Sequence, residues 1–170
     1  AAMFMSAGLI YAALGHDRTT ELAGIGRRLP VSVAAFALGG LALIGVPTSG
    51  AYLAKDLLLQ AAATTGQWWW AVVIQAGGVF TSSYVLLVLA HALAPADAPI
   101  RLRASVSRVG EAAALALALC SLLLGLVPWG AILAVPRDTP SDSFAFASAV
   151  KVLWPILAGG VLAILVGSWG

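Results

Sequence analysis

Charged residues are scarce in this sequence. Of its 170 residues, nine are Lys or Arg and seven are Asp or Glu, which is 9% of the chain, while 61% are hydrophobic. A soluble domain usually carries about 25% charged and about 45–50% apolar residues. So few charges cannot cover the surface of a water-soluble globule, and so apolar a chain is not disordered. The composition therefore favours a polytopic membrane protein.

Cysteine is scarcer still, and the excess of positive charge is small. Cys120 is the single cysteine, which excludes an internal disulfide, and the net charge is only +2. This small excess does not indicate a nucleic-acid partner. The sequence shows no metal-ligand cluster, nucleotide-binding loop or nucleophile–base pair. We therefore predict no cofactor, no metal site and no covalent catalysis.

Five apolar segments, separated by polar connectors, predict an all-α fold with about five transmembrane segments. We divide the chain into residues 1–93 and a second part, 94–170, that carries two additional transmembrane helices. The first segment is too short to span a bilayer alone, so we expect it to continue from a longer protein. The apolar segments are residues 1–14, 31–63, 68–93, 109–135 and 144–169.

The second segment is too long for one straight span. Its 33 residues (31–63) would extend roughly 50 Å as a continuous helix, whereas the hydrocarbon core is about 30 Å thick. Gly45, Pro47 and Gly50 lie in its middle; proline removes a backbone donor, and glycine tolerates non-helical angles. We therefore predict a broken helix.

Arginines in the connectors predict the orientation. Connectors 15–30 and 94–108 hold six arginines, the connector after the second segment holds none, and the last one holds only Arg137. Positive connectors usually face the cytoplasm, so we expect connectors 15–30 and 94–108 on that side. The six are Arg18, Arg27, Arg28, Arg101, Arg103 and Arg108.

Lys55 is the best candidate for chemistry, because it follows the predicted break. It lies about 13 residues before Trp68, at the start of an interfacial Trp68–Trp69–Trp70 belt, or roughly 20 Å along a helix. A cation in hydrocarbon costs about 2.5–3.5 kcal/mol on insertion scales, so such residues usually face a wet cavity or a partner. A desolvated lysine also exchanges its proton more readily near neutral pH. The alternative is that Lys55 merely extends to the interface.

Other polar side chains in the apolar segments are weaker candidates. Thr81, Ser82, Ser83 and Tyr84 place four hydroxyls in the third segment and can line a hydrated path, although such groups also join helices. His91 suits a proton path by its ordinary pKa, but an anchoring role near the interface is the alternative. Glu111 and Lys151 lie near segment starts, where we expect them to reach the interface.

Three blocks in the first half occur together in one known family. FMSAGLIY (4–11), ELAGIGRRLP (21–30) and GVPTSGAYLAKD (45–56) follow one another in order. They resemble the proton-conducting, antiporter-like membrane subunits of respiratory complex I, Mrp-type antiporters and membrane-bound hydrogenases. The resemblance is dense over residues 4–93 and makes residues 1–93 the C-terminal part of that family's second antiporter-like repeat, with the broken helix at 31–63. Leu87 stands where that family often has arginine, and Ala51–Tyr52 departs from its usual pattern.

The resemblance implies a function, a location and partners. It makes Lys55 the ionisable residue of a broken helix in a subunit that translocates protons or cations across the plasma membrane, within an NADH-quinone oxidoreductase-type complex. Gly45, Pro47 and Gly50, the four hydroxyls and His91 would line its path. The expected partners are other membrane subunits, the missing N-terminal part of the fold and the lipid bilayer. The alternative functions are a non-transporting membrane scaffold and a docking site formed by the arginine connectors.

Overall fold

The computed structural model describes residues 1–16, 22–95, 103, 105–127 and 144–168, of which 144–152 are described by their backbone alone. Every element in these residues is a helix, and the described part contains no strand. The all-α prediction is therefore confirmed. Arg18, Arg101 and Arg137 lie outside the described residues, as does the side chain of Lys151.

The helices follow the apolar segments of the sequence closely. One element was not predicted: a single helical turn, α2, lies inside the polar connector that precedes the second segment. The elements are α1 (Ala2–Leu14), α2 (Ile25–Arg28), α3 (Pro30–Ile44), α4 (Gly50–Thr64), α5 (Trp69–Leu93), α6 (Arg108–Leu123), the 3-10 turn η2 (Leu124–Leu126) and α8 (Phe144–Gly167).

Two of the described helices are long and apolar enough to cross a membrane, namely Trp69–Leu93 and Arg108–Leu126. Three shorter apolar helices, Ala2–Leu14, Pro30–Ile44 and Leu153–Gly167, accompany them. Large apolar side chains are exposed on the outer surface, such as Phe4 (80% exposed) and Ile164 (73%). Such a surface fits contact with lipid or other subunits rather than water. The number of five spans stays a prediction.

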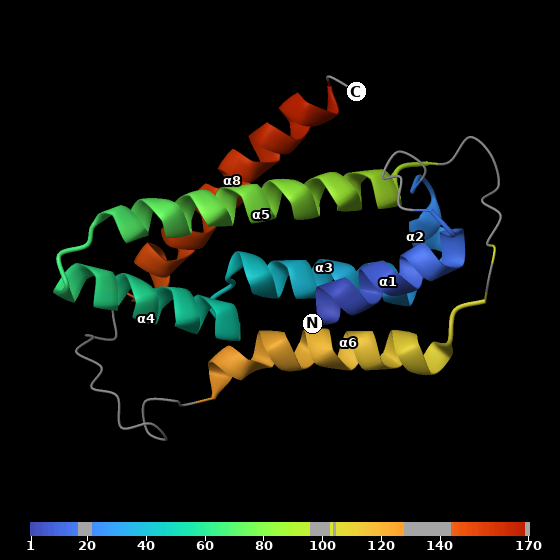
Figure 1. The fold of residues 1–170 in the computed structure, drawn as a ribbon, viewed down its shortest axis with the longest axis horizontal. Helices are drawn as coiled ribbons and strands as arrows, with labels where there is room; N and C mark the ends of the chain where they lie inside the picture. Colours follow the sequence, from blue (N-terminus) through green and yellow to red (C-terminus); the bar gives the residue numbers. More distant parts are fainter. Residues whose placement is uncertain (17–21, 96–102, 104, 128–143, 169–170) are drawn as a thin grey trace.

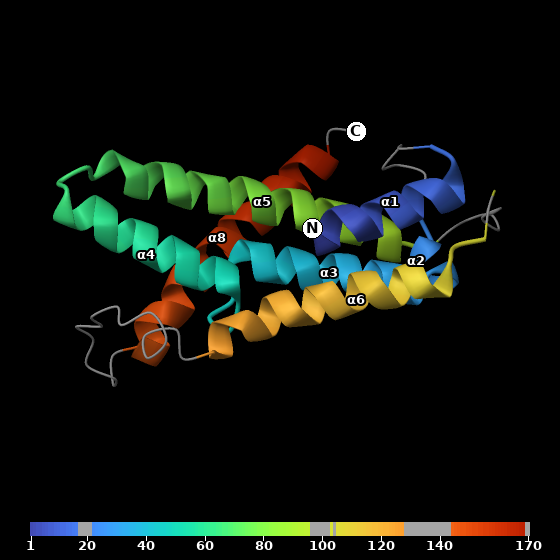
Figure 2. The same ribbon diagram turned by 60° about the horizontal axis from the view of Figure 1, so that its bottom comes forward.

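The helices run along one common direction, and α8 crosses α5 at an angle (Figures 1 and 2). α3 packs against α1, α5 and α6, so it is the central helix of the bundle. The described parts of the two arginine-bearing connectors lie at one end of the bundle (Figure 1), where the Arg103 N–H donates to the Ala13 carbonyl of α1 over 2.8 Å. This shared end agrees with the prediction that both connectors lie on one side of a membrane.

Small residues let α3 and its neighbours approach closely. Phe36, Ile44, Val85 and Val88 form one buried cluster between α3 and α5. Gly40 of α3 leaves room there, because a Cβ atom at this position would lie 2.6 Å from a Val85 methyl group. Close helix packing of this kind fixes the end of α3, where the candidate site begins.

Candidate functional site

The helix break lies where the glycines and the proline predicted it. α3 ends before Gly45, which has a φ of 101°, and α4 begins at Gly50. The Gly45 and Val46 N–H groups both donate to the Leu41 carbonyl and close the end of α3. The buried Ser49 side chain accepts a 3.2 Å hydrogen bond from the Tyr52 N–H and caps α4. The broken helix is therefore confirmed, and its two new ends face each other.

A contact from a distant element supports this break. The Gly125 N–H of η2 donates to the Thr48 carbonyl over 3.0 Å. A Cβ atom at Gly125 would lie 2.5 Å from the carbonyl carbon and oxygen of Thr48. Only glycine allows two backbones to approach so closely, so η2 packs directly against the backbone of the break.

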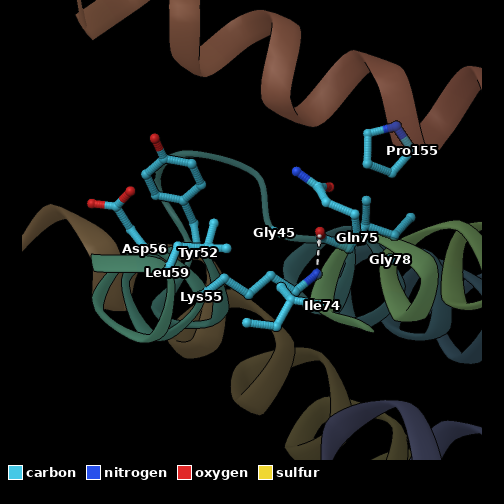
Figure 3. Close-up of a pocket in the computed structure, with 10 residues that line it drawn as sticks. Gly45, Tyr52, Lys55, Asp56, Leu59, Ile74, Gln75, Gly78 and Pro155 are labelled. Carbon is cyan, nitrogen blue, oxygen red and sulfur yellow. Dashed lines mark hydrogen bonds between the residues drawn. The ribbon is translucent and has the colours of Figure 1, made fainter. Parts of the chain in front are cut away.

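Lys55 joins the two halves of the broken helix. Its side chain runs from α4 back to the end of α3, where Nζ donates to the Ile44 carbonyl (2.8 Å) and the Leu43 carbonyl (3.4 Å) (Figure 3). The last carbonyls of a helix lack intrahelical partners and carry partial negative charge. They therefore attract an ammonium group, and Lys55 provides it.

A small cavity of about 40 Å³ lies beside the Lys55 side chain. Such a volume holds roughly one to three water molecules. Half-buried Gln75 of α5 also lines it, as does Pro155 of α8 (Figure 3). Asp56 is a further lining residue, and its carboxylate accepts a 2.9 Å hydrogen bond from Gln60 Nε2. The lining is Ile44, Gly45, Tyr52, Lys55, Asp56, Leu59, Ile74, Gln75, Gly78 and Pro155.

The four hydroxyl-bearing residues of α5 lie outside the lining of this cavity. Thr81 Oγ1 donates to the Gly77 carbonyl of its own helix (2.8 Å), and Ser82 Oγ contacts the Pro155 carbonyl of α8 (2.6 Å). Ser83 is buried, whereas Tyr84 is 50% exposed and its ring packs edge-on against Phe36. None of the four lines the cavity beside Lys55. Their assignment to an ion path remains a prediction.

His91 and Glu111 lie far from the break along their helices. His91 follows Gly78, which lines the cavity, by 13 residues, or roughly 20 Å along α5. Its Nδ1 lies 2.8 Å from the Leu87 carbonyl. Glu111 near the start of α6 accepts a 2.7 Å hydrogen bond from the buried Ser32 hydroxyl of α3. Glu111 is therefore held between two helices, although we expected it to reach the interface.

Sequence reasoning missed several members of the site, among them Gln75, Gly125 and Pro155. Of these three, only Gln75 has a signal of its own, a polar amide in the apolar third segment. Gly125 and Pro155 are ordinary in their own segments and reach the site only through packing. In the part of the chain that the structure describes, no group of His, Cys, Asp or Glu could hold a metal ion.

The fold and the site define a class: a helical membrane domain with a lysine bound at the break of a helix. Residues 1–81 match the family model described as NADH:quinone oxidoreductase/Mrp antiporter, TM. The match confirms the resemblance seen in the sequence, and the chain is similar to antiporter-like membrane subunits. It covers α1 to α4 and half of α5, which includes the whole break and Lys55. No curated protein and no solved structure matches the chain.

Replacing Gly45 by alanine tests the geometry at the end of α3. A side chain at a φ of 101° is strained by about 1–2 kcal/mol. The new Cβ would meet Lys55 Nζ and Cδ at 3.6 Å, which is an ordinary contact, so the strained φ is the cause of the expected effect. We expect Gly45→Ala to lower the melting temperature of the detergent-solubilised protein. Gly8→Ala is the control, because a Cβ there meets nothing within 4 Å. Equal melting temperatures for the two variants would contradict this prediction.

Proposed function

We propose that this chain translocates protons, or another cation, across the plasma membrane as part of an antiporter-like subunit. The group that changes its charge is Lys55. The observation that carries this proposal is the pair of hydrogen bonds from Lys55 Nζ to the terminal carbonyls of α3. The match of residues 1–81 to an oxidoreductase and antiporter family supports it.

Charge explains how this arrangement can move a proton. The protonated ammonium is attracted to the partly negative end of α3, and the neutral amine is attracted much less. Loss of the proton therefore frees the side chain to leave the Ile44 carbonyl. Gly45 and Gly78 lie beside Nζ, and even a Cβ at either position would make only an ordinary contact with it, at 3.6 and 3.8 Å. Proton release is thus coupled to movement of Lys55 at the break.

Water in the adjacent cavity provides the other half of the transfer. A neutral amine can take up a proton that is relayed along a few water molecules, each of which accepts one proton as it passes one on, and the cavity has room for only a few of them. The lining includes the Gln75 amide, which can both donate and accept hydrogen bonds. A small, partly polar cavity can hold a proton path without becoming an open pore.

The protein works, in this proposal, beside other membrane subunits of an NADH-quinone oxidoreductase-type complex. The apolar outer surface of the bundle is suited to such neighbours and to lipid. Transport in vesicles that hold matched amounts of wild-type and Lys55-variant complex tests the proposed function. A scaffold with no transport role requires only that Lys55 keep its positive charge at the break.

The orientation can be tested separately by cysteine labelling. In a Cys120→Ala background, Arg27→Cys and Arg103→Cys should not react with a membrane-impermeant thiol reagent added outside intact cells. Gln67→Cys, in the exposed turn at the opposite end of the bundle, should react. The reason is the positive charge of the two connectors, which favours the cytoplasmic side. External labelling at Arg27→Cys and Arg103→Cys, with none at Gln67→Cys, would reverse the proposed orientation.

A further inference from the structure

α8 packs against α5 with very little space between the two backbones. A Cβ atom at Gly159 of α8 would overlap with the Ser82 hydroxyl and lie 2.8 Å from both Ser83 N and the Val79 carbonyl oxygen. Its neighbour Gly160 is different, since a Cβ there would meet only a Leu86 methyl at 3.6 Å. The contact is therefore specific to one face of α8.

A buried hydrogen bond fixes the two helices at this point. Ser82 is fully buried, and its Oγ lies 2.6 Å from the Pro155 carbonyl and 2.9 Å from the Val79 carbonyl. The hydroxyl has a single hydrogen, and the shorter distance favours donation to Pro155. This bond crosses from α5 to α8 at the residue where proline interrupts the hydrogen bonding of α8.

The same proline forms one wall of the cavity beside Lys55. Gly78 lies between the two residues: a Cβ there would be 3.5 Å from Pro155 Cβ and 3.8 Å from Lys55 Nζ. Pro155 thus presents an apolar ring to a cavity that otherwise includes the ends of a broken helix and several polar side chains. An apolar wall at this place limits how much water reaches the ammonium group.

We propose that α8 closes the Lys55 cavity on this side and that Ser82 is the residue that positions it. Ser82 then acts as a positioning residue through its hydrogen bond to the Pro155 carbonyl. Pro155 and the rest of α8 belong to the second half of the chain, outside the segment 1–81 that matches the family model. The importance of this wall for transport rests on the proposed function, but closure of the cavity can be measured without transport.

Water access at position 55 is the direct measure. In the full chain, in its native membrane, Cys120→Ala and Lys55→Cys together leave a single thiol at the cavity. Adding Ser82→Ala should raise the rate of reaction with a small water-soluble thiol reagent roughly fivefold, the shift in equilibrium that the loss of an ordinary hydrogen bond produces. Thr81→Ala is the matched control. It also removes a hydroxyl from α5, but that hydroxyl bonds within its own helix, so the rate should not change.

A second pair of variants moves α8 while residue 82 stays serine. Gly159→Ala should raise the reaction rate at position 55, because its methyl group must push α8 away from α5. Gly160→Ala should leave the rate unchanged, since its methyl group meets only an ordinary contact. Equal rates for Ser82→Ala and Thr81→Ala, or for Gly159→Ala and Gly160→Ala, would overturn the proposal. Normal transport in a Lys55 variant would instead contradict the proposed function and leave these rates unaffected.

Discussion

Lys55→Ala should reduce proton or cation transport to the background level of vesicles while leaving the protein inserted in the membrane. The substitution removes the ammonium group that bonds to the Ile44 and Leu43 carbonyls, and with it the charge that changes during transfer. The adjacent cavity has room for a water molecule to bond to these carbonyls in the variant, which limits the cost to folding. The measurement is transport by matched amounts of wild-type and variant complex.

Lys55→Arg separates transport from a structural role. Arginine keeps the positive charge and can donate to the same carbonyls, but it does not lose its proton in proteins. We therefore expect this variant to assemble normally and to fail in transport as completely as Lys55→Ala. Leu58→Ala is the control on the same helix, because Leu58 is 58% exposed and donates no hydrogen bond to the break.

A scaffold role predicts the opposite order of the two variants. Lys55→Arg would then be tolerated, because the charge at the end of α3 is preserved, and Lys55→Ala would act only by reducing assembly. Normal transport by assembled Lys55→Ala would contradict the proposed function. Comparing the two variants is more informative than either variant alone, since arginine keeps a positive charge at residue 55 and alanine removes it.

Gly125→Ala should have the largest effect on stability among the glycine substitutions near the break. Its methyl group would lie 2.5 Å from the Thr48 carbonyl and 2.8 Å from Ser49 N, so η2 must move away. Overpacking of this kind costs about 1–3 kcal/mol. The hydrogen bond from Gly125 N–H to the Thr48 carbonyl is weakened at the same time. We expect a clear fall in melting temperature.

Transport should fall together with stability in this variant, because Thr48 and Ser49 form the turn that holds the two half-helices. Gly77→Ala is the matched control: a Cβ at Gly77 meets nothing within 4 Å, and alanine in a helix is more stable than glycine by about 1 kcal/mol. A Gly125→Ala protein that melts and transports like Gly77→Ala would show that η2 does not support the break.

Local chemistry decided much of the fold before any packing. The apolar segments predict the helices because a segment inside a membrane must hydrogen-bond its own backbone N–H and C=O groups. The interruption of the second segment follows from Gly45, Pro47 and Gly50, since their effects on the backbone need no distant partner. Lys55 stands out for the same reason: one cation in a long apolar segment requires an explanation from the sequence alone.

Tertiary packing decided what surrounds that lysine. The sequence cannot tell which turn of α8 meets α5, so Pro155 and Gly125 gave no sign that they lie at the break. It also grouped Thr81, Ser82, Ser83 and Tyr84 by position, whereas a helix turns consecutive residues about 100° apart and directs them to different neighbours. Ser82 meets Pro155 and Tyr84 meets Phe36 for this reason. Spacing along one helix fixes the direction of a side chain, but only the arrangement of several helices determines what it touches.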